Sequence, residues 1–321
     1  VQRTWDLSLD ALAAEGRPQA RPLLLVLSCF APATPIPGWL LQLPPLADLL
    51  AGPGHAGQDN GAERRGLRAG LQGLSRTGLI DISATGSPAG VHAVTVHPVV
   101  ADANRIRLAA SADAERRAVQ ETVVALFEAA TAGLDPVRPG DWPTWRRLRA
   151  HMNAAIDLLA DDLDPAVLVR LLSVSAVGTE ALLGAGRLAA AGKLAQASVA
   201  AATFLPSDHP AALTARGYLA RTLVRRGRSG DAETIFRELL ADRLRVQGED
   251  HLGTLANRHD LAAALGVQGR FGEAEELYRR LLADDYRLRG PDHRETLAAR
   301  SNLARVIGLR GRYAEAEDLS R

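Results

Sequence analysis

The chain has 321 residues, of which 47% are hydrophobic and only 4% aromatic, and its formal net charge is +1. This composition favours stacked helices over a sheet-rich core, which uses more β-branched and aromatic residues, so the predicted fold class is mainly α. A net charge near zero excludes a global attraction to nucleic acid or to an acidic membrane, so any partner must be recognised locally.

Cysteine content and hydropathy indicate the compartment. Cys29 is the only cysteine, so no intramolecular disulfide can form, and the predicted location is the reducing cytoplasm. We find no apolar run of the roughly 18 residues that a membrane span needs, and predict no membrane contact. Val1 is not a methionine and opens no signal-peptide pattern, so we expect an excised fragment or a processed chain.

The N-terminal part changes its hydrophobic period along the chain. Apolar residues at helical spacing predict helices at residues 5–12, 20–30 and 62–77, with a further apolar restart at 39–43 and a glycine-rich loop at 52–61. Alternation then predicts two strands, at 79–82 and 91–97, around a turn at 85–90. Helices followed by a hairpin predict a winged-helix domain over residues 1–110.

The middle of the chain is predicted to be helical. A connector is expected at residues 111–163, with helical patterns at 112–131 and 142–163 on either side of a proline- and glycine-containing break. Residues 164–206 read as an irregular helical hairpin, because Ala197 follows Gly192 by five residues as in the units downstream, yet Gly192 lies only 35 residues before Gly227.

A repeat of 42 residues organises residues 207–321. Its markers recur at that interval: Asp208-His209, Asp250-His251 and Asp292-His293, then Gly227, Gly269 and Gly311, then Ala232, Ala274 and Ala316. Each unit is predicted to be a hairpin of a helix A and a helix B that stacks on its neighbours. The pattern resembles the tetratricopeptide repeat, and Gly311 to Glu317 resembles its kinesin-light-chain subtype. We predict three units, the last truncated, with further repeats or a cap after Arg321.

The order of the parts resembles the C-terminal portion of NB-ARC (STAND) signalling ATPases of actinobacterial type. The residues that carry this resemblance are the run from Thr4 to Leu9, the proline-broken segment after it and the run from Val96 to Asp102. It implies a nucleotide-binding domain before Val1, which the winged helix contacts and which binds ADP or ATP with Mg²⁺. It also implies that His97 senses bound ADP. The alternative is a wing histidine whose hydrogen bonds are satisfied by the backbone.

The fragment itself is predicted not to be an enzyme and to hold no cofactor. It lacks the G-x-x-x-x-G-K-[ST] phosphate loop. The nearest run, from Gly186 to Lys193, has one residue too many between its glycines and is followed by Leu194, where Ser or Thr is needed. We predict no metal site, because the repeat histidines lie one per unit. Their Asp neighbours are expected to cap the A helices.

A peptide groove is predicted along the A helices, because stacked hairpins curve and leave a concave face. The resemblance to the tetratricopeptide pattern implies that the groove residues are Tyr218, Arg221, His259, Asp260, Ser301, Asn302 and Arg305. Their amide, carboxylate and guanidinium groups suit a peptide backbone and an acidic side chain. The alternative is a solvated polar face, and the nearby column of Arg216, Arg258 and Arg300 is open to interpretation as packing through aliphatic stems.

The chain is therefore predicted to be the interaction and sensing region of a nucleotide-switched signalling protein that binds a protein or peptide partner. The less favoured alternative is a DNA-binding winged helix with a ligand-sensing repeat array. In that case an arginine face on the helix at 62–77 would contact phosphates through Arg64, Arg65, Arg68 and Arg76. A solvated arginine face explains the same residues.

Overall fold

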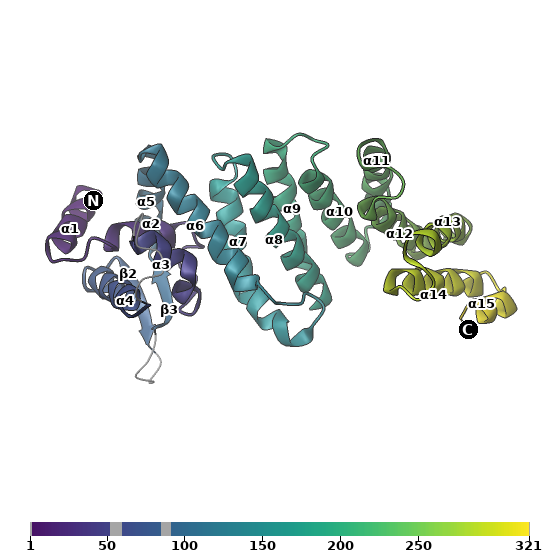
Figure 1. Cartoon of the computed structure of the whole chain (residues 1–321), viewed down its shortest axis with the longest axis horizontal. Coiled ribbons are helices and arrows are strands. Elements are labelled where there is room, and N and C mark those ends of the chain that lie inside the picture. The colour runs from purple at the N-terminus through teal and green to yellow at the C-terminus, as the bar shows by residue number, and fades with distance from the viewer. Residues whose placement is uncertain (1, 52–59, 85–90, 321) are drawn as a thin grey trace. The chain divides into compact units, whose positions relative to one another are not determined.

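The computed structural model describes residues 2–51, 60–84 and 91–320, and it confirms a mainly α fold with a small sheet (Figure 1). The chain divides into two compact units, Val1–Ala185 and Gly186–Arg321. The hairpin predicted at residues 164–206 contributes one helix to each unit, and the predicted domain limits at 110, 163 and 206 stay predictions.

The first unit is built around a largely apolar helix, α2 (Ala20–Ser28), whose residues 23–27 are at most 1% exposed. Helices α3 (Pro44–Ala51), α4 (Asn60–Arg76), α5 (Pro98–Ala110) and α6 (Asp113–Thr131) all contact α2, while α1 (Gln2–Ala14) packs on it near the N-terminus. The predicted helices at 5–12, 20–30 and 62–77 are thereby confirmed. A short 3₁₀ turn, Leu40–Gln42, leads into α3.

Three antiparallel strands pair in the order β1-β3-β2. The predicted hairpin is confirmed as β2 (Ile80–Ala84) and β3 (Val91–Val96), with Ile80 opposite Val96. Strand β1 (Ile36–Pro37) was not predicted, because two residues among prolines carry no alternation. The predicted turn at 85–90 and most of the loop at 52–61 lie outside the described residues. Helices beside a three-stranded sheet agree with the predicted winged helix, which stays a prediction.

The connector contains helix α7 (Trp142–Leu159), preceded by a 3₁₀ turn at Pro139–Asp141, and it leads to helix α8 (Pro165–Gly184). Helix α5, which precedes α6, was not predicted, although Pro98 at its first position is a typical helix start. Helix α8 is long and apolar enough by composition to cross a membrane, although Arg170 and Glu180 interrupt its apolar run. Most of the apolar window of α8 is buried inside the protein, as in the core helix of a folded domain.

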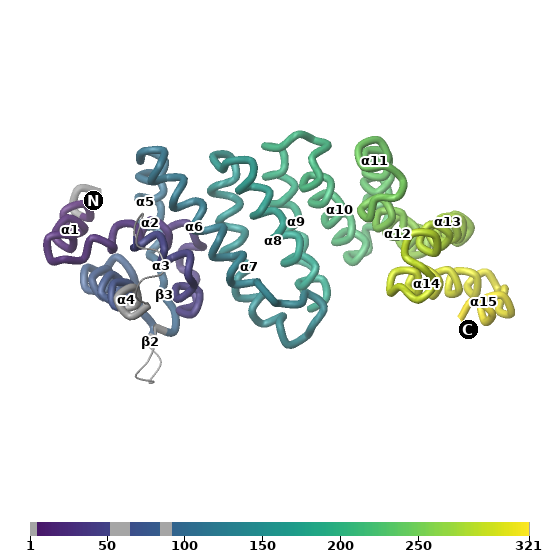
Figure 2. The backbone as a smooth tube through the Cα atoms, viewed as in Figure 1, coloured from purple at the N-terminus to yellow at the C-terminus, as the bar shows by residue number. Residues whose placement is uncertain are grey.

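The second unit is an array of helical hairpins, in which each helix from α10 to α15 packs on the next one along the chain (Figure 2). It begins with α9 (Leu188–Ala201) and a 3₁₀ turn at Ala202–Phe204. The three predicted repeats follow as α10 (Pro210–Arg225) with α11 (Ser229–Gln247), α12 (Leu252–Val267) with α13 (Phe271–Arg289), and α14 (Arg294–Leu309) with α15 (Tyr313–Ser320). Gly227, Gly269 and Gly311 follow the A helices with φ of 79°, 77° and 81°, a left-handed conformation that glycine adopts without steric cost.

Small side chains let the helices of a hairpin approach closely. Ala232 and Ala274 on the B helices are completely buried, and Phe236 and Tyr278, one turn further on, fill the interior beside them. The predicted role of this alanine column is therefore confirmed for the first two units. Ala316, the third member, is partly buried.

The predicted caps of the A helices are corrected by the structure. The capping side chains belong to His209, His251 and His293, whose Nδ1 atoms accept from the N–H two residues later at 3.1, 3.0 and 3.2 Å. Two of the preceding aspartates form ion pairs instead, Asp208 with Arg245 and Asp250 with Arg287. A neutral imidazole nitrogen replaces the carboxylate oxygen because it reaches the same orphan N–H group.

An ion-pair cluster joins each repeat to the next and recurs at the 42-residue interval. Glu233 on α11 accepts from Arg270 at 2.6 and 2.7 Å, and its equivalent on α13, Glu275, accepts from Arg312 at 2.7 Å. Both arginines follow the glycine that ends an A helix, and each also binds a glutamate in the first turn of its own B helix. Each repeat is thus joined to the next through a shielded carboxylate on its B helix, with side chains 14% exposed at Glu233 and 1% exposed at Glu275.

Candidate functional site

Five predicted groove residues form one connected polar network across the A helices of all three repeats. The guanidinium carbon of Arg221 lies 5.2 Å from the centre of the Tyr218 ring, and Arg221 Nε lies 3.9 Å from Asp260 Oδ2. Asp260 Oδ1 is 3.5 Å from His259 Nδ1, and His259 Nε2 is 3.0 Å from the amide nitrogen of Asn302. We call Tyr218, Arg221, His259, Asp260 and Asn302 the A-helix network.

Hydrogen-bond chemistry orients the histidine of this network. An amide nitrogen can only donate, so His259 Nε2 accepts from Asn302, and the proton of the neutral ring is on Nδ1, facing Asp260. Arg221 bridges α10 to α12 and Asn302 bridges α14 to α12. The network therefore links three successive repeats through the side chains of α12.

The network is half-buried, as a binding face requires. The side chains of Arg221, His259 and Asp260 are 35%, 34% and 24% exposed, so a partner can reach them while their pairing is partly shielded from water. Ser301 and Arg305, the other two predicted residues, are exposed. The structure does not join Ser301 to the network.

Tyr278 on helix α13 lies against the network and was missed by the sequence analysis. Its ring meets that of His259 edge-on with centroids 5.7 Å apart, and its side chain is fully buried. Burial raises its pKa to about 12, with Arg305 acting in the opposite direction. Its hydroxyl has no hydrogen-bond partner among the described residues. The signal in the sequence is that Tyr278 occupies the position of Phe236 in the preceding repeat.

Positive charge dominates the interactions of Asp260 within the second unit. Besides Arg221, this carboxylate acts on Arg243, a nearly buried arginine of α11. Burial lowers the pKa of Arg243, Asp260 opposes that effect, and Arg216 adds to it. Gly253 makes room for this arginine, since a Cβ there would lie 1.8 Å from Arg243 Nη1. Arg243, like Tyr278, was not predicted, because only the folded hairpin places it near α12.

The adjacent arginine column forms ion pairs within the first two repeats. Arg216 Nη1 donates to Asp242 at 2.7 Å, and Arg258 Nη1 donates to Asp284 at 2.6 Å. These pairs join helix A to helix B at equivalent positions. The guanidinium groups of its first two members are thus paired between the two helices of a hairpin, and the interpretation of the column as packing through aliphatic stems stays a prediction.

His97 caps helix α5 at the end of strand β3. Its ring is exposed, and its Nδ1 accepts from the N–H of Val99 at 3.4 Å. The backbone contact that the alternative interpretation requires is present, and the exposed ring remains accessible to a ligand. Of the arginines weighed for DNA contact, Arg76 pairs with Glu15 at 3.1 Å, and the side chain of Arg64 lies outside the described part of the chain.

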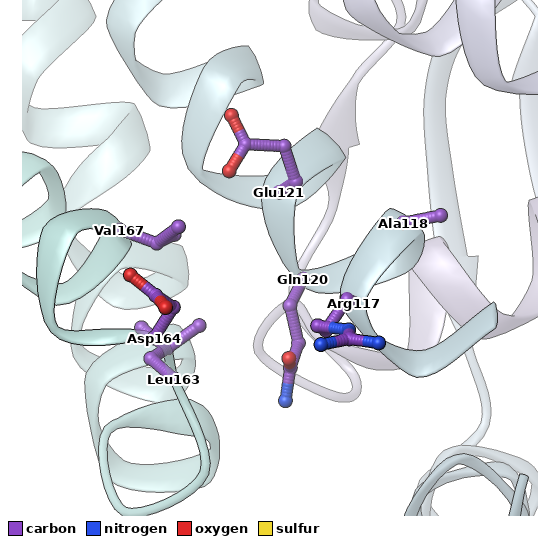
Figure 3. A pocket seen from close by; sticks show the side chains of 7 residues that line it. All are labelled: Arg117, Ala118, Gln120, Glu121, Leu163, Asp164 and Val167. Carbon is purple, nitrogen blue, oxygen red and sulfur yellow. The ribbon is translucent and has the colours of Figure 1, made fainter. Parts of the chain in front are cut away.

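A pocket of about 350 Å³ opens between α6 and the start of α8 in the first unit (Figure 3). It is lined by Arg117, Ala118, Gln120, Glu121, Leu163, Asp164 and Val167. Its polar groups are engaged with the protein: Glu121 pairs with Arg170, Gln120 donates to Asp162, and Asp164 caps α8. None of the residues predicted for a site lines it.

Metal ligands do not gather in the described residues, where no group of three His, Cys, Asp or Glu side chains could hold an ion. Cys29 is buried, and burial raises its pKa to about 12, so it is an unreactive thiol.

Several solved structures are similar to the chain. The nearly identical TPR-like repeats of a kinesin light chain from Podosopora anserina share 23% identity, cover 62% of this chain and 92% of theirs, and give a TM-score of 0.49. BtubC from P. vanneervenii shares 17% identity over 67% of this chain and 82% of its own, with a TM-score of 0.46. A STAND protein with a tetratricopeptide repeat sensor from Pyrococcus horikoshii shares 11% identity over 94% of this chain and 55% of its own, with a TM-score of 0.31.

Family models match the repeat region. No curated protein matches the sequence. Two tetratricopeptide repeat models match, one over residues 227–286 and 268–321 and the other over residues 213–238. These matches cover the helical hairpins whose A helices carry the network. Residues 213–321 therefore consist of tetratricopeptide repeats.

Proposed function

We propose that this chain is the interaction and sensing region of a nucleotide-switched signalling protein, and that the A-helix network, together with Arg305, is its partner-binding face. The single observation that carries the proposal is the continuity of the network over three repeats. A row of half-buried polar groups that bridges successive helices offers a partner several fixed donors and acceptors at once.

The chemistry of the face favours an acidic segment of a protein or peptide. The guanidinium of Arg221 lies 5.2 Å from the centre of the Tyr218 ring, at the long distance of 3.9 Å from Asp260, and Arg305 is exposed, so this face carries two guanidinium groups toward which a partner's carboxylate is attracted. Asn302, which His259 orients through its Nε2, adds an amide that can bind a peptide backbone.

Replacing Asn302 and Arg305 together by Ala tests the binding face. We expect partner pull-down to be lost, because the double variant removes the bridge to His259 and an exposed cation. The matched control is Glu276→Ala with Arg280→Ala, an exposed ion pair on α13 outside the network. Loss of pull-down in both variants, or retention in both with helices intact by circular dichroism, would disprove the assignment.

The switch part of the proposal rests on the resemblance and on His97. In the parent protein we propose that a nucleotide-binding domain binds ADP or ATP with Mg²⁺, and that the exposed ring of His97 contacts the nucleotide. The winged-helix domain would then report the nucleotide state to the repeats. Cytoplasmic location fits such a protein and is part of the proposal.

Replacing His97 by Ala in the full-length parent tests this part. We expect faster release of ADP and a shift toward the active state, measured as nucleotide retained after gel filtration. Because His97 also caps α5, His97→Asn is the control: asparagine restores a cap but not an imidazole. If both variants retain nucleotide like the wild type, His97 is a structural cap only.

A further inference from the structure

A strained loop lies between helix α2 and strand β1 in the first unit. Ala33 has a φ of 53°, the left-handed conformation that residues with a side chain rarely adopt, and it is the one non-glycine residue with positive φ among those described. Strain of this kind persists only where the surroundings hold the backbone in place. We call residues 30–35 the pinned loop.

His151 on helix α7 holds the pinned loop at two points. Its Nδ1 accepts from the N–H of Ala31 at 3.3 Å, and its Nε2 lies 3.2 Å from the carbonyl oxygen of Pro35. The ring is fully buried and meets Phe30 edge-on, with centroids 5.6 Å apart. Both ring nitrogens are thus used, which fixes the neutral tautomer with its proton on Nε2.

The pinned loop is in turn hydrogen-bonded to the last residue of strand β3. Between the two points fixed by His151, the N–H of Ala33 donates to the carbonyl oxygen of Val96 at 3.1 Å. Val96 is joined directly to His97, which caps α5. Helix α5 is bonded to the start of the pinned loop as well, because Arg105 donates to the carbonyl oxygens of Ser28 and Phe30 at 2.9 and 3.1 Å.

We propose that the pinned loop is a mechanical coupling that transmits movement of helix α7 to His97. A displacement of α7 pulls His151 off the loop, Ala33 is then released from its strained conformation, and the bond to Val96 is lost with it. The position of His97 therefore depends on a helix of the connector. Only the role of His97 in sensing nucleotide rests on the proposed function, since the coupling is a property of the first unit alone.

Arg105 and Cys29 are titratable side chains near the pinned loop, and each donates to backbone carbonyl oxygens. Arg105 is the cation that faces the loop from α5, where it also pairs with Asp102 at 3.2 Å. Cys29, at the end of α2, donates to the carbonyl oxygen of Leu25 and lies within its own helix turn. The coupling thus runs through backbone groups that His151 and Ala33 bind.

Hydrogen exchange of the whole chain, measured by mass spectrometry, tests the coupling without nucleotide. His151→Phe keeps a buried ring and removes both hydrogen bonds, and we expect exchange to quicken roughly tenfold in residues 30–38 and also in 92–102. His151→Asn restores an acceptor near Ala31 and should restore part of the protection in both segments together. Asn153→Ala is the control, because Asn153 donates only within α7, to the carbonyl oxygen of Arg149.

The two segments must respond together for the proposal to stand. If either His151 variant loosens residues 30–38 while 92–102 exchange as in the wild type, the coupling does not exist. If His151→Phe speeds exchange throughout the first unit, the comparison of residues 30–38 with residues 92–102 is made in His151→Asn, the milder variant. A failure of His97 to affect nucleotide retention would overturn the proposed function and leave this result unchanged.

Discussion

His151 is fully buried, although its ring titrates near neutral pH when it is exposed to water. Burial lowers its pKa from 6.5 to about 4, and the hydrogen bond to Pro35 opposes the shift only in part. The unfolded chain therefore binds more protons than the folded one between these two values. The stability that the neutral ring contributes is complete above pH 6.5 and is lost as the pH falls toward 4.

Acid should therefore destabilise the first unit through this residue. The shift corresponds to at most about 3 kcal/mol between pH 6.5 and pH 4. All four tryptophans, at positions 5, 39, 142 and 145, lie in this unit, so urea unfolding followed by tryptophan fluorescence measures it selectively. His151→Phe should flatten the pH dependence, whereas the exposed His92→Gln should not. An unchanged slope in His151→Phe would refute the assignment.

The caps of the A helices show which details of single residues the sequence does not determine. The pairs Asp208-His209, Asp250-His251 and Asp292-His293 mark the helix starts correctly, yet the structure uses the histidine as the cap. Both residue types can accept from an N–H group, so pattern alone does not choose between them. The choice depends on the backbone angles at the helix start, where these histidines are extended.

At the scale of elements, the contacts between repeats depend on a buried carboxylate. Burial alone would raise the pKa of Glu275, but hydrogen bonds from Arg312, Arg310 and Arg279 outweigh it and lower the pKa. The stability gained from this carboxylate is present above its unfolded pKa of 4.5 and is lost as the pH falls below that value. The arginines are themselves 41–47% exposed, so solvent screens part of the interaction.

Glu275→Gln should destabilise the repeat array by about 1–3 kcal/mol, because it removes the charge that the three guanidinium groups share. Far-ultraviolet circular dichroism in urea would show an earlier transition, while tryptophan fluorescence, which reports the first unit, stays in place. The control is Glu276→Gln, whose carboxylate pairs with Arg280 on the exposed side of the same helix. Equal effects of the two substitutions would show that the buried cluster does not hold the repeats together.

Helices with a strong hydrophobic periodicity could be predicted from the sequence. A strand that is defined only by its pairing with another strand could not. The apolar spacing of α2, α4, α6 and the repeat helices placed them from sequence, because burial of one face dictates that spacing. Strand β1 has two residues, and only its pairing with β3 makes it a strand. The polar cluster around Glu233 and Glu275 recurs every 42 residues, so a search for repeated charges would have found it.

At the scale of the whole molecule, the repeat arithmetic predicted the fold of the second unit and the face that its A helices share. Alignment of these repeats to the tetratricopeptide pattern placed Tyr218, Arg221, His259, Asp260 and Asn302 on one face, where equivalent positions of stacked hairpins adjoin. It could not supply Arg243 and Tyr278, which belong to the B helices and reach the same face only through tertiary packing.

The central proposal is that the A-helix network, together with Arg305, binds an acidic segment of a protein partner. It is tested most directly by isothermal titration of the shortest partner segment that retains binding, at low and high salt, with the wild type, Arg305→Glu and the control Arg280→Glu. We predict affinity at least about tenfold weaker for Arg305→Glu alone, with a smaller salt dependence. Equal affinities for the wild type and Arg305→Glu at low salt would contradict the claim.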